Sequence, residues 1–425
     1  MKQRIWACAA LVCMSVVAAD EYKPYRPTTE QVALARTLQT PSQPTGRNAY
    51  PVAWSLEFDM TPAEAEKAYQ ADHAVASDWA RRHWADGAQG KWPSFPYAAA
   101  ATAKRLPDIT AAEYALMCGK STPSCLDAVR AHRNDLRAVL KRHERLLARV
   151  KSLVGYDIWW NTMPPDPLMP VARVQPALQL WNTAAALQFV DGDTSGGLAS
   201  ACTASASFRR FQASANTQLD RVFMSAGARL NLQLATDMLA AMPIDVPLPA
   251  PCRKAFATPT IEEVQFGGVA ANEWVASQRA QEMAGAKGWE YISEGWALAL
   301  GDEVTRRAAF EDIEVPATVL DRAPMDEAQI REGWPGASLR EGRLANLNAF
   351  VDRAADYVAT LRMASLMLWL HEHPSPQSLQ ARLSAAPLGP LAKRISVGCS
   401  GRCLVMTERK TYVVNRTWAV RPTEP

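Results

Sequence analysis

Glu294 offers the most suggestive chemistry in the chain, because it stands in the run WEYISEGWALALGDE, residues 289–303. The run predicts an amphipathic helix, and a glutamate on such a helix can complete a zinc site when two histidines approach it. In the alternative, the helix is an ordinary packed one, with Glu294 in solvent and Trp296 in the core. The predicted apolar face comprises Trp289, Ile292, Trp296 and Leu300.

The histidines of the chain bear on these two alternatives. A zinc peptidase of the gluzincin kind needs HExxH, which places two histidines four residues apart on one helix face. None of the six histidines stands in that pattern. The segment HEHP offers His371 and His373, but they are two residues apart and follow Glu294. Histidines at such a place also suit the negative end of a helix dipole.

The run EGWALAL resembles the second half of the motif of a secreted peptidase family, which pairs HEAxPGH with Glu-Gly-Trp-Ala-Leu-Tyr. The first half is absent from this chain, and Ala299 stands at the position of the tyrosine. We therefore expect no metal, no cofactor and no assigned catalytic residue. The candidates that remain, if folding brings them beside other groups, are Glu294, Trp296, His371 and His373.

The first residues predict export. A basic start and a short apolar segment, residues 5–17, precede small residues that end at Ala19, the pattern of a signal peptide. We expect cleavage after Ala19 and a periplasmic or secreted protein, while a membrane anchor or a lipoprotein stays open as an alternative. No other segment has the roughly 18 uncharged apolar residues that a membrane helix needs.

Six cysteines remain after signal cleavage, and an even number in an exported chain predicts disulfides. A zinc site is the alternative, but the short pairs are not CxxC, and an oxidising compartment disfavours free thiolates. The predicted disulfides are Cys118–Cys125, Cys399–Cys403 and, by elimination, Cys202–Cys252.

The composition is 48% hydrophobic with only 21 glycines, and abundant alanine favours helix. The apolar stripe over 126–154 is the strongest helical pattern and contains His143, which we interpret as a core histidine. The segment 51–58 predicts a short extended stretch, and 393–425 a small antiparallel meander. Caps and apolar spacing predict helices over 61–87, 126–154, 175–190, 197–213, 215–242, 260–285, 289–311 and 339–372.

These elements predict a mainly α fold: an antiparallel helical bundle or helical-repeat-like array with a small C-terminal antiparallel β element. The repeat interpretation rests on the succession of Ala-rich antiparallel helix pairs, because no repeated sequence is visible. The predicted organisation is a signal peptide (1–19), an N-terminal helical region (20–160), a central helical-repeat-like region (161–392) and a β-rich element (393–425).

The charge balance argues against a nucleic-acid partner. The formal net charge is +3, and loss of Lys2 and Arg4 with the signal peptide brings the chain close to neutral. The basic stretch 132–151 also contains acidic residues. We interpret it as a solvated helix face, since a nucleic-acid footprint needs a concentrated basic surface.

The runs GRNAYPVAWSLEFDM, MCGKSTPSCLDAVRAHR, DGDTSGGLASACTASASFRRF and CSGRCLV resemble uncharacterised exported proteins of proteobacteria. The resemblance implies a helical, exported protein and no particular activity. We expect a non-catalytic binding or interaction protein of the bacterial envelope, of the immunity or scaffold type, whose partner is another envelope or secreted protein. The rival hypothesis is an envelope hydrolase that uses carboxylates near Glu294, with a metallopeptidase as its least favoured version.

Overall fold

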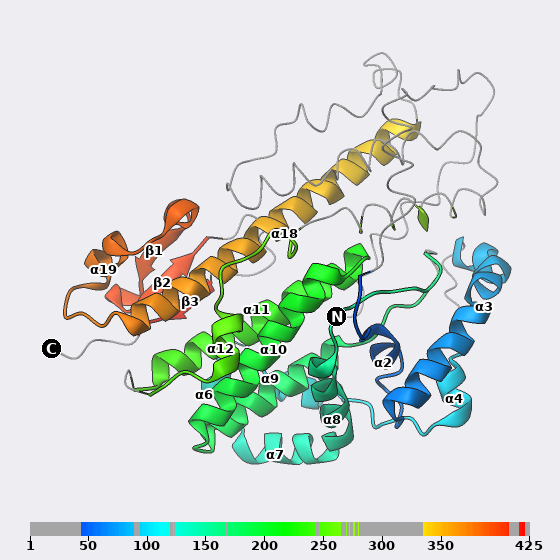
Figure 1. Cartoon of the computed structure of the whole chain (residues 1–425), viewed down its shortest axis with the longest axis horizontal. Helices are drawn as coiled ribbons and strands as arrows, with labels where there is room; N and C mark the ends of the chain where they lie inside the picture. Colours follow the sequence, from blue (N-terminus) through cyan, green and yellow to red (C-terminus); the bar gives the residue numbers. More distant parts are fainter. Residues whose placement is uncertain are drawn as a thin grey trace.

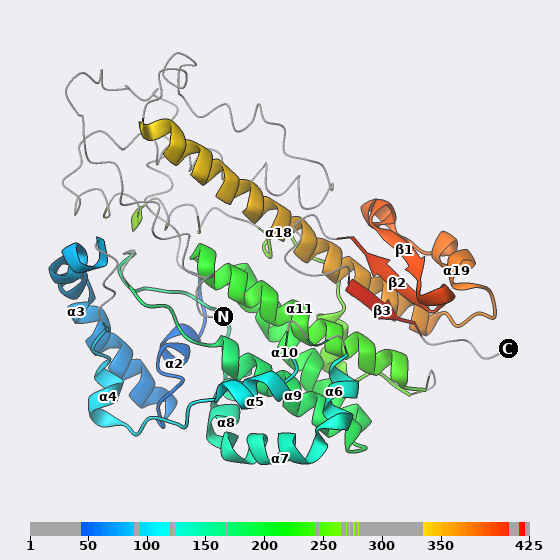
Figure 2. The same cartoon turned by 180° about the vertical axis from the view of Figure 1, so that it is seen from behind.

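The fold is mainly α, with a small three-stranded antiparallel sheet near the C-terminus, as predicted. Figures 1 and 2 show a helical bundle at the centre, a helical layer at one edge and the sheet at the other. Among the residues described, no helix combines the length and apolar character needed to cross a bilayer. The computed structural model describes residues 44–88, 94–119, 122, 124–165, 169–243, 246–264, scattered positions from 269 to 279, 335–407 and 416–420.

Three antiparallel helices form the centre of the molecule: α9 (Gln175–Val190), α10 (Thr194–Ser214) and α11 (Gln218–Ala241). They confirm the helices predicted over 175–190, 197–213 and 215–242. Helix α10 begins earlier than predicted because the Asp193 carboxylate caps it, accepting a hydrogen bond from the Gly196 N–H at 2.9 Å.

Two glycines let α9 and α10 turn sharply and pack closely. Gly192 joins them with φ +104°, a conformation that glycine adopts without strain. Gly197 lies so near α9 that a β-carbon there would come within 2.8 Å of the Ala185 carbonyl oxygen. The two helices therefore approach backbone to backbone at this end. A larger residue at Gly197 would force them apart, whereas one at Gly192 would strain the turn.

The single long helix predicted over 126–154 is wrong, because the chain breaks at His132 and His143. The backbone there leaves helical geometry, with φ −117°, ψ 28° at His132 and φ −105°, ψ 21° at His143. All three resulting helices pack on α9, and the bends let one apolar stripe stay against it along the whole length. They are α6 (Cys125–Ala131), α7 (Arg133–Arg142) and α8 (Glu144–Ser152), followed by the 3-10 turn η2 (Leu153–Gly155).

Ion pairs between helices hold these bends. Arg137 Nη2 lies 2.8 Å from Asp191 Oδ1, and Arg142 Nη1 lies 3.0 Å from Glu113 Oε1. His143 is 1% exposed, as expected of a core histidine, and its Nε2 approaches the same Glu113 oxygen to 3.4 Å without hydrogen-bond geometry. The basic stretch thus lies at the surface, as expected, but its arginines also join helix segments.

The N-terminal layer contains α2 (Tyr50–Trp54), α3 (Pro62–Ala88) and α4 (Ala98–Thr102), and the next helix, α5 (Ala111–Leu116), contacts α7 of the bundle. The extended stretch predicted over 51–58 is wrong, because α2 occupies its first half. Proline suits a first helical turn, and the helix lets the Trp54 indole N–H donate to Asp72 Oδ2 of α3 at 2.7 Å. The helix predicted over 61–87 is confirmed, with a capping box between Thr61 and Glu64.

Helix α12 (Ala250–Ala255) packs on α10, and the long α18 (Pro335–Glu372) runs along α11, as Figure 1 shows. The helix predicted over 339–372 is confirmed with an earlier start. The helices predicted over 260–285 and 289–311 lie almost wholly outside the described residues. The short α19 (Leu379–Ala385) and the 3-10 turn η3 (Gly389–Lys393) lead into the sheet.

The predicted C-terminal meander is confirmed as β1 (Ile395–Gly398), β2 (Cys403–Met406) and β3 (Arg416–Ala419), paired in that order. Arg394, just before β1, forms a buried ion pair with Asp356 of α18. The Arg394 guanidinium also donates to the Thr407 carbonyl oxygen after β2, at 3.0 and 2.9 Å. The sheet is thereby fastened to the long helix at the open end of its first hairpin.

One hydrophobic core joins all of these parts. It includes Tyr50 of α2, Leu198 of α10, Tyr357 of α18 and Trp418 of β3, each at most 1% exposed. Burial of large aromatic side chains supplies a major share of the hydrophobic stabilisation of such a core. The N-terminal layer, the bundle and the sheet therefore stabilise one another.

Candidate functional site

Two of the four residues nominated from the sequence lie in the described part of the chain, and two do not. Glu294 and Trp296 lie outside the described residues. His371 and His373 end α18, where the His373 ring stacks on Trp369 at 4.6 Å between centroids. Nowhere in the described part of the chain do three His, Cys, Asp or Glu side chains stand together as metal ligands could.

The six cysteines form the three predicted disulfides, Cys118–Cys125, Cys202–Cys252 and Cys399–Cys403. The second of them ties α10 to α12 across 50 residues of chain. Disulfides persist in oxidising compartments outside the cytosol. The three bonds therefore fit an oxidising, extracytoplasmic location.

Four side chains from separate segments meet in a buried group, which we call the Asp220 cluster: Tyr50, Tyr69, Trp159 and Asp220. The Tyr50 ring lies 5.4 Å from the Trp159 ring and 5.8 Å from the Tyr69 ring, both edge-on. All four residues are at most 1% exposed. A carboxyl group in such aromatic surroundings has lost its hydration and must rely on the protein for partners.

The start of α11 explains how Asp220 comes to be there. Thr217 caps the helix by accepting from the Asp220 backbone N–H at 3.1 Å, and its hydroxyl donates to Asp220 Oδ2 at 2.6 Å. Trp159 reaches the same junction because its backbone N–H donates to Ser214 Oγ, at the end of α10, at 2.8 Å. The other carboxyl oxygen, Asp220 Oδ1, makes no hydrogen bond within the described residues.

The two tyrosines of the cluster differ in their hydrogen bonds. The Tyr69 hydroxyl lies 2.9 Å from Thr162 Oγ1 and accepts from the Thr162 backbone N–H at 3.1 Å. The Tyr50 hydroxyl is fully buried and makes no hydrogen bond to any described residue, although the Ala172 backbone lies close to it. Tyr69 thus anchors α3 to the 158–163 segment, while Tyr50 contributes its ring.

Burial dominates the electrostatics of this cluster. It raises the pKa of Asp220 from 3.8 to about 6, and the nearby Thr217 hydroxyl and Trp159 indole only partly oppose it. The Trp159 indole N–H approaches the carboxyl group but falls short of hydrogen-bond geometry. Burial also raises the pKa of Tyr69 to about 12 and that of Tyr50 well above its ordinary value, so both stay neutral.

Such a carboxyl group can take up or release a proton near neutral pH, which is a property of catalytic acids and bases. Asp220 is 0% exposed, however, so no substrate touches it in this conformation. Its protonation acts instead on the joint between α2, α3 and the bundle. The Asp220 cluster is therefore a buried contact between α2, α3 and the bundle that contains a carboxyl group with a raised pKa.

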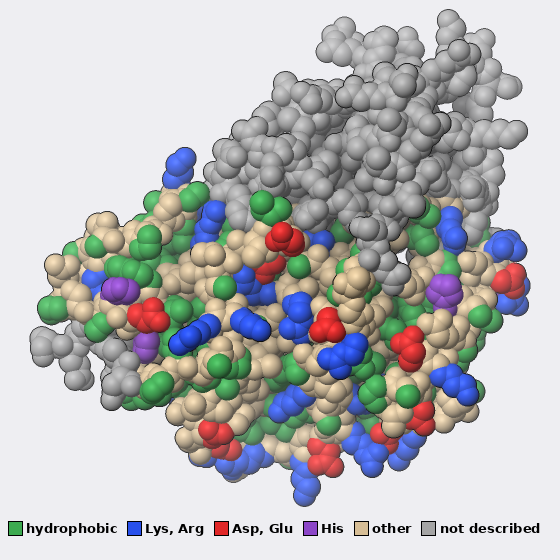
Figure 3. Space-filling view, in the orientation of Figure 1, with side chains coloured by type: hydrophobic (Ala, Val, Ile, Leu, Met, Phe, Trp, Pro, Cys, Tyr) green, Lys and Arg blue, Asp and Glu red, His purple; other side chains and the backbone are tan. Residues whose placement is uncertain are grey.

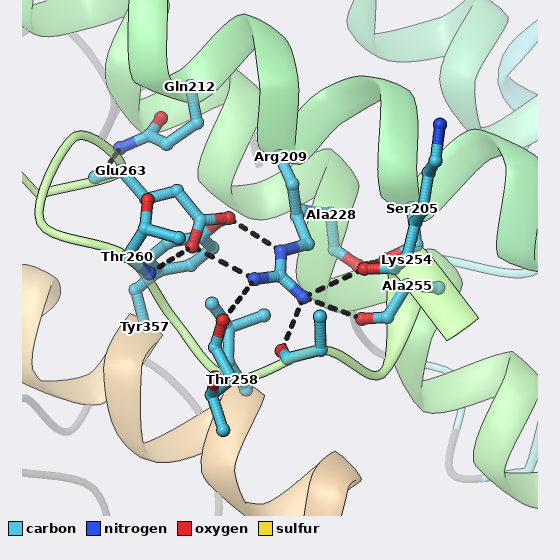
Figure 4. Close-up of polar contacts among 12 residues, drawn as sticks. Ser205, Arg209, Gln212, Ala228, Lys254, Ala255, Thr258, Thr260, Glu263 and Tyr357 are labelled. Carbon is cyan, nitrogen blue, oxygen red and sulfur yellow. Dashed lines mark hydrogen bonds and ion pairs between the residues drawn. The ribbon is translucent and has the colours of Figure 1, made fainter. Parts of the chain in front are cut away.

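A second buried polar group, which we call the Arg209 network, joins α10, α18 and the segment after α12 (Figure 4). Arg209 forms a two-pronged ion pair with Glu263, at 2.5 Å from Nε to Oε1 and 2.9 Å from Nη2 to Oε2. Tyr357 of α18 donates to Glu263 Oε1 at 3.3 Å. The remaining guanidinium hydrogens go to the carbonyl oxygens of Lys254, Ala255, Ala257 and Thr258, at 2.7 to 3.1 Å.

This network satisfies its charges from within. Burial alone would lower the pKa of Arg209, but the hydrogen bonds and charge of Glu263 outweigh it and raise that pKa. The side chains of Arg209 and Glu263 are 7% and 5% exposed. A planar guanidinium with a bidentate carboxylate suits a buried pair, so the network is a structural clamp on the 254–263 segment.

Sequence analysis nominated no residue of either group. The Thr-x-x-Asp spacing at Thr217–Asp220 indicates a helix cap, but a cap is usually exposed, and nothing local indicates its burial. Arg209 stands seven residues after Cys202, two helical turns along the same face of α10. That spacing was the available signal that Arg209 faces the disulfide-linked segment, whereas its neighbour Arg210 faces solvent.

Comparisons of the chain with protein-family models, with curated proteins and with solved structures found no match.

Proposed function

We propose that the chain is an exported, non-catalytic binding or interaction protein of the bacterial envelope. It presents a rigid helical surface to another envelope or secreted protein, as an immunity-type protein or a scaffold does. In this proposal residues 1–19 are a signal peptide, and the mature protein starts at Asp20. The three disulfides support export, because such bonds are rare in reducing compartments.

The observation that carries the proposal is that two buried arginines pair with carboxylates of the same chain. Arg209 is paired with Glu263, and Arg394 with Asp356, each pair clamping one segment of the fold onto a long helix. Both pairs hold structural segments in place, a task different from binding a reacting group. A surface held in one arrangement loses less conformational entropy when a partner binds.

The surface has the mixed character of protein-binding surfaces. On the face shown in Figure 3, basic, acidic and hydrophobic side chains are interspersed over the bundle. Such a mixture is compatible with a non-obligate protein interface, which as a whole is about as apolar as the rest of a protein surface. The large hydrophobic side chains that stand exposed in the described structure are Val75, Tyr114, Leu219 and Ile261.

The test places a photo-crosslinking residue at each of these four exposed hydrophobic positions in the mature protein. Exposure to an envelope extract should give one dominant crosslinked protein from one position and little from the other three, which act as matched controls. The purified partner should then bind saturably. Substitution of that position by lysine should weaken binding at least roughly tenfold, as expected for a central interface residue.

The rival hydrolase hypothesis is tested on the same preparations. Absence of a saturable partner, together with hydrolysis of envelope material that Glu294→Gln abolishes, would overturn the proposal. Stoichiometric zinc in the purified mature protein would also contradict it. Export is tested separately: the protein recovered from the periplasm of a Gram-negative host should begin at Asp20, and retention of residues 1–19 there would refute the signal peptide.

A further inference from the structure

The turn CSGRC between β1 and β2 differs from the rest of the described backbone. Cys399 has φ +49°, Ser400 φ +54° and Gly401 φ +87°, three consecutive residues in the left-handed region. Within the described chain, Cys399 and Ser400 are the non-glycine residues with positive φ. Residues with a β-carbon are disfavoured there, so the turn holds two of them in an unfavourable conformation.

The disulfide Cys399–Cys403 holds this conformation closed. It spans four residues, and its second cysteine opens β2 opposite Gly398 of β1. The turn is further fixed by the Arg402 N–H, which donates to the Gly398 and Cys399 carbonyl oxygens at 3.2 and 3.3 Å. Opening the disulfide would let Cys399 and Ser400 relax to ordinary backbone angles.

The two cysteines of this disulfide differ in exposure. Cys399 is exposed on the turn, whereas Cys403 is 3% exposed beneath it. The cysteines of the other two disulfides are all buried, at 0% for Cys118, 0% for Cys202 and 0% for Cys252, and 9% for Cys125. A thiol in solution can therefore reach Cys399 Sγ while the rest of the protein stays folded.

We propose that Cys399–Cys403 is a site of thiol–disulfide exchange, which accepts low-molecular-weight thiols and protein dithiols at Cys399. An external thiolate attacks Cys399 Sγ, forms a mixed disulfide with it and expels Cys403 as a thiolate. A second thiol then attacks the external sulfur of the mixed disulfide. This releases the oxidised reductant as a disulfide, leaves Cys399 and Cys403 reduced, and transfers two electrons in all.

The surrounding structure allows this cycle without unfolding. The sheet is held to α18 by the buried Arg394–Asp356 pair. The backbone of β2 pairs with β3 from Cys403 to Met406, and neither contact depends on the bond between the two sulfurs. Exposed and strained disulfides are the readily reduced ones, whereas buried structural disulfides resist reduction. The geometry thus separates one exchangeable bond from two structural bonds in the same chain.

The experiment equilibrates the folded, oxidised protein with glutathione or dithiothreitol at graded ratios of reduced to oxidised form. Free thiols are then alkylated and mapped by peptide mass spectrometry. Cys399 and Cys403 should become labelled at ratios at least roughly tenfold below those that open the other disulfides. A mixed disulfide with glutathione should form on Cys399 and not on Cys403, while the circular dichroism of the fold is unchanged.

Substitutions at Ser400 test whether the turn sets the reactivity. Ser400→Asn, which tolerates the left-handed region, should make the disulfide harder to reduce, and Ser400→Val, which does not, should make it roughly tenfold easier. The matched control is Ser396→Val, an exposed position on β1 of the same hairpin, where a β-branched residue suits the strand. The control should leave the reduction ratio unchanged.

Two results would overturn the proposal. One is reduction of all three disulfides at the same ratio, which means that only unfolding exposes them. The other is equal reduction ratios for Ser400→Asn and Ser400→Val in variants whose circular dichroism matches that of the parent protein. Neither result bears on whether the protein binds an envelope partner.

Discussion

The Arg209 network and the Asp220 cluster are both buried and polar, yet they treat charge in opposite ways. Arg209 and Glu263 neutralise each other through two direct hydrogen bonds. Asp220 has a partner for one oxygen only and faces aromatic rings. In the Arg209 network, pairing offsets the cost of burying the charges. In the Asp220 cluster, burial raises the pKa of Asp220 to about 6.

The difference shows what each region contributes to the fold. A paired charge holds its geometry at any pH at which both partners are ionised, so the Arg209 network acts as a permanent clamp. An unpaired buried carboxyl group is most stable when protonated, so the Asp220 cluster weakens as the pH rises. The Arg209 network fixes the bundle at all such pH values. The Asp220 cluster makes the attachment of the N-terminal layer depend on pH.

The largest expected effect comes from breaking the clamp. Glu263→Gln leaves the Arg209 guanidinium buried without its counter-charge, which should lower the free energy of unfolding by about 3–5 kcal/mol. Urea denaturation at pH 7 measures the loss. Glu262→Gln, at the exposed neighbouring position, is the matched control and should leave stability almost unchanged. An equal loss in both variants would show that the ion pair is not the cause.

The disulfide Cys202–Cys252 holds α12 to the same helix, two turns before Arg209 on α10. Replacing both cysteines by alanine should lower the free energy of unfolding by about 2–4 kcal/mol, because the unfolded chain regains freedom. Combined with Glu263→Gln, the two losses should not add, since both contacts fasten the continuous stretch from α12 to Glu263 onto α10. Additive losses in denaturation curves would mean that the disulfide and the ion pair act on independent parts.

The Asp220 cluster should make the free energy of unfolding depend on pH. Its folded-state pKa is raised, so its stabilising contribution is complete below pH 3.8 and is lost as the pH rises through about 6. The total loss is about 3 kcal/mol at most, from about 1.4 kcal/mol for each unit of pKa. Asp220→Asn should remove this part of the pH dependence, measured as the difference from the parent protein in denaturation curves from pH 3.5 to 8.

The control for that measurement is Asp157→Asn. The Arg47 backbone N–H and side chain hold the pKa of Asp157 below its ordinary value, so Asp157 affects stability in the opposite direction, losing its contribution as the pH falls. The two variants should therefore change the slope of stability against pH with opposite signs. The same sign in both would contradict the assignment of Asp220 as a buried, destabilised carboxylate.

The smallest expected effect is the difference in stability loss between substitutions at the two tyrosines of the Asp220 cluster. Tyr69→Phe removes a hydroxyl that is bonded to Thr162 and should cost about 1 kcal/mol. Tyr50→Phe removes a buried hydroxyl that makes no hydrogen bond within the described residues, and should be neutral or slightly stabilising. Thermal unfolding of the pair at one pH measures the difference, and a larger loss for Tyr50→Phe would contradict the hydrogen-bond assignment.

The parts of the fold that the sequence predicted well are those with local causes. Helices α9, α10 and α11 follow from apolar spacing and from caps such as Asp193, which act within a few residues. The break of the 126–154 stripe at His132 and His143 accompanies distant contacts, since the three short helices pack on α9 and pair with Asp191 and Glu113. An apolar stripe of constant period carries no sign of such a bend.

The buried polar groups were beyond prediction for the same reason. Arg209 and Glu263 are 54 residues apart, and Tyr357 is another 94 residues away. Only folding brings them together, and single arginines and glutamates look alike in a sequence whether buried or solvated. The disulfides were predictable because the number and spacing of the cysteines restrict the pairing. The roles of Glu294 and Trp296 stay predictions from the sequence.

Trp418 is 0% exposed in β3, the last strand described, within the same core that begins at Ala49. A ribosome delivers Ala49 long before it delivers Trp418. For most of that time the growing chain lacks an essential piece of its interior and leaves apolar surface uncovered. The nascent chain should therefore bind holding chaperones until β3 has been synthesised.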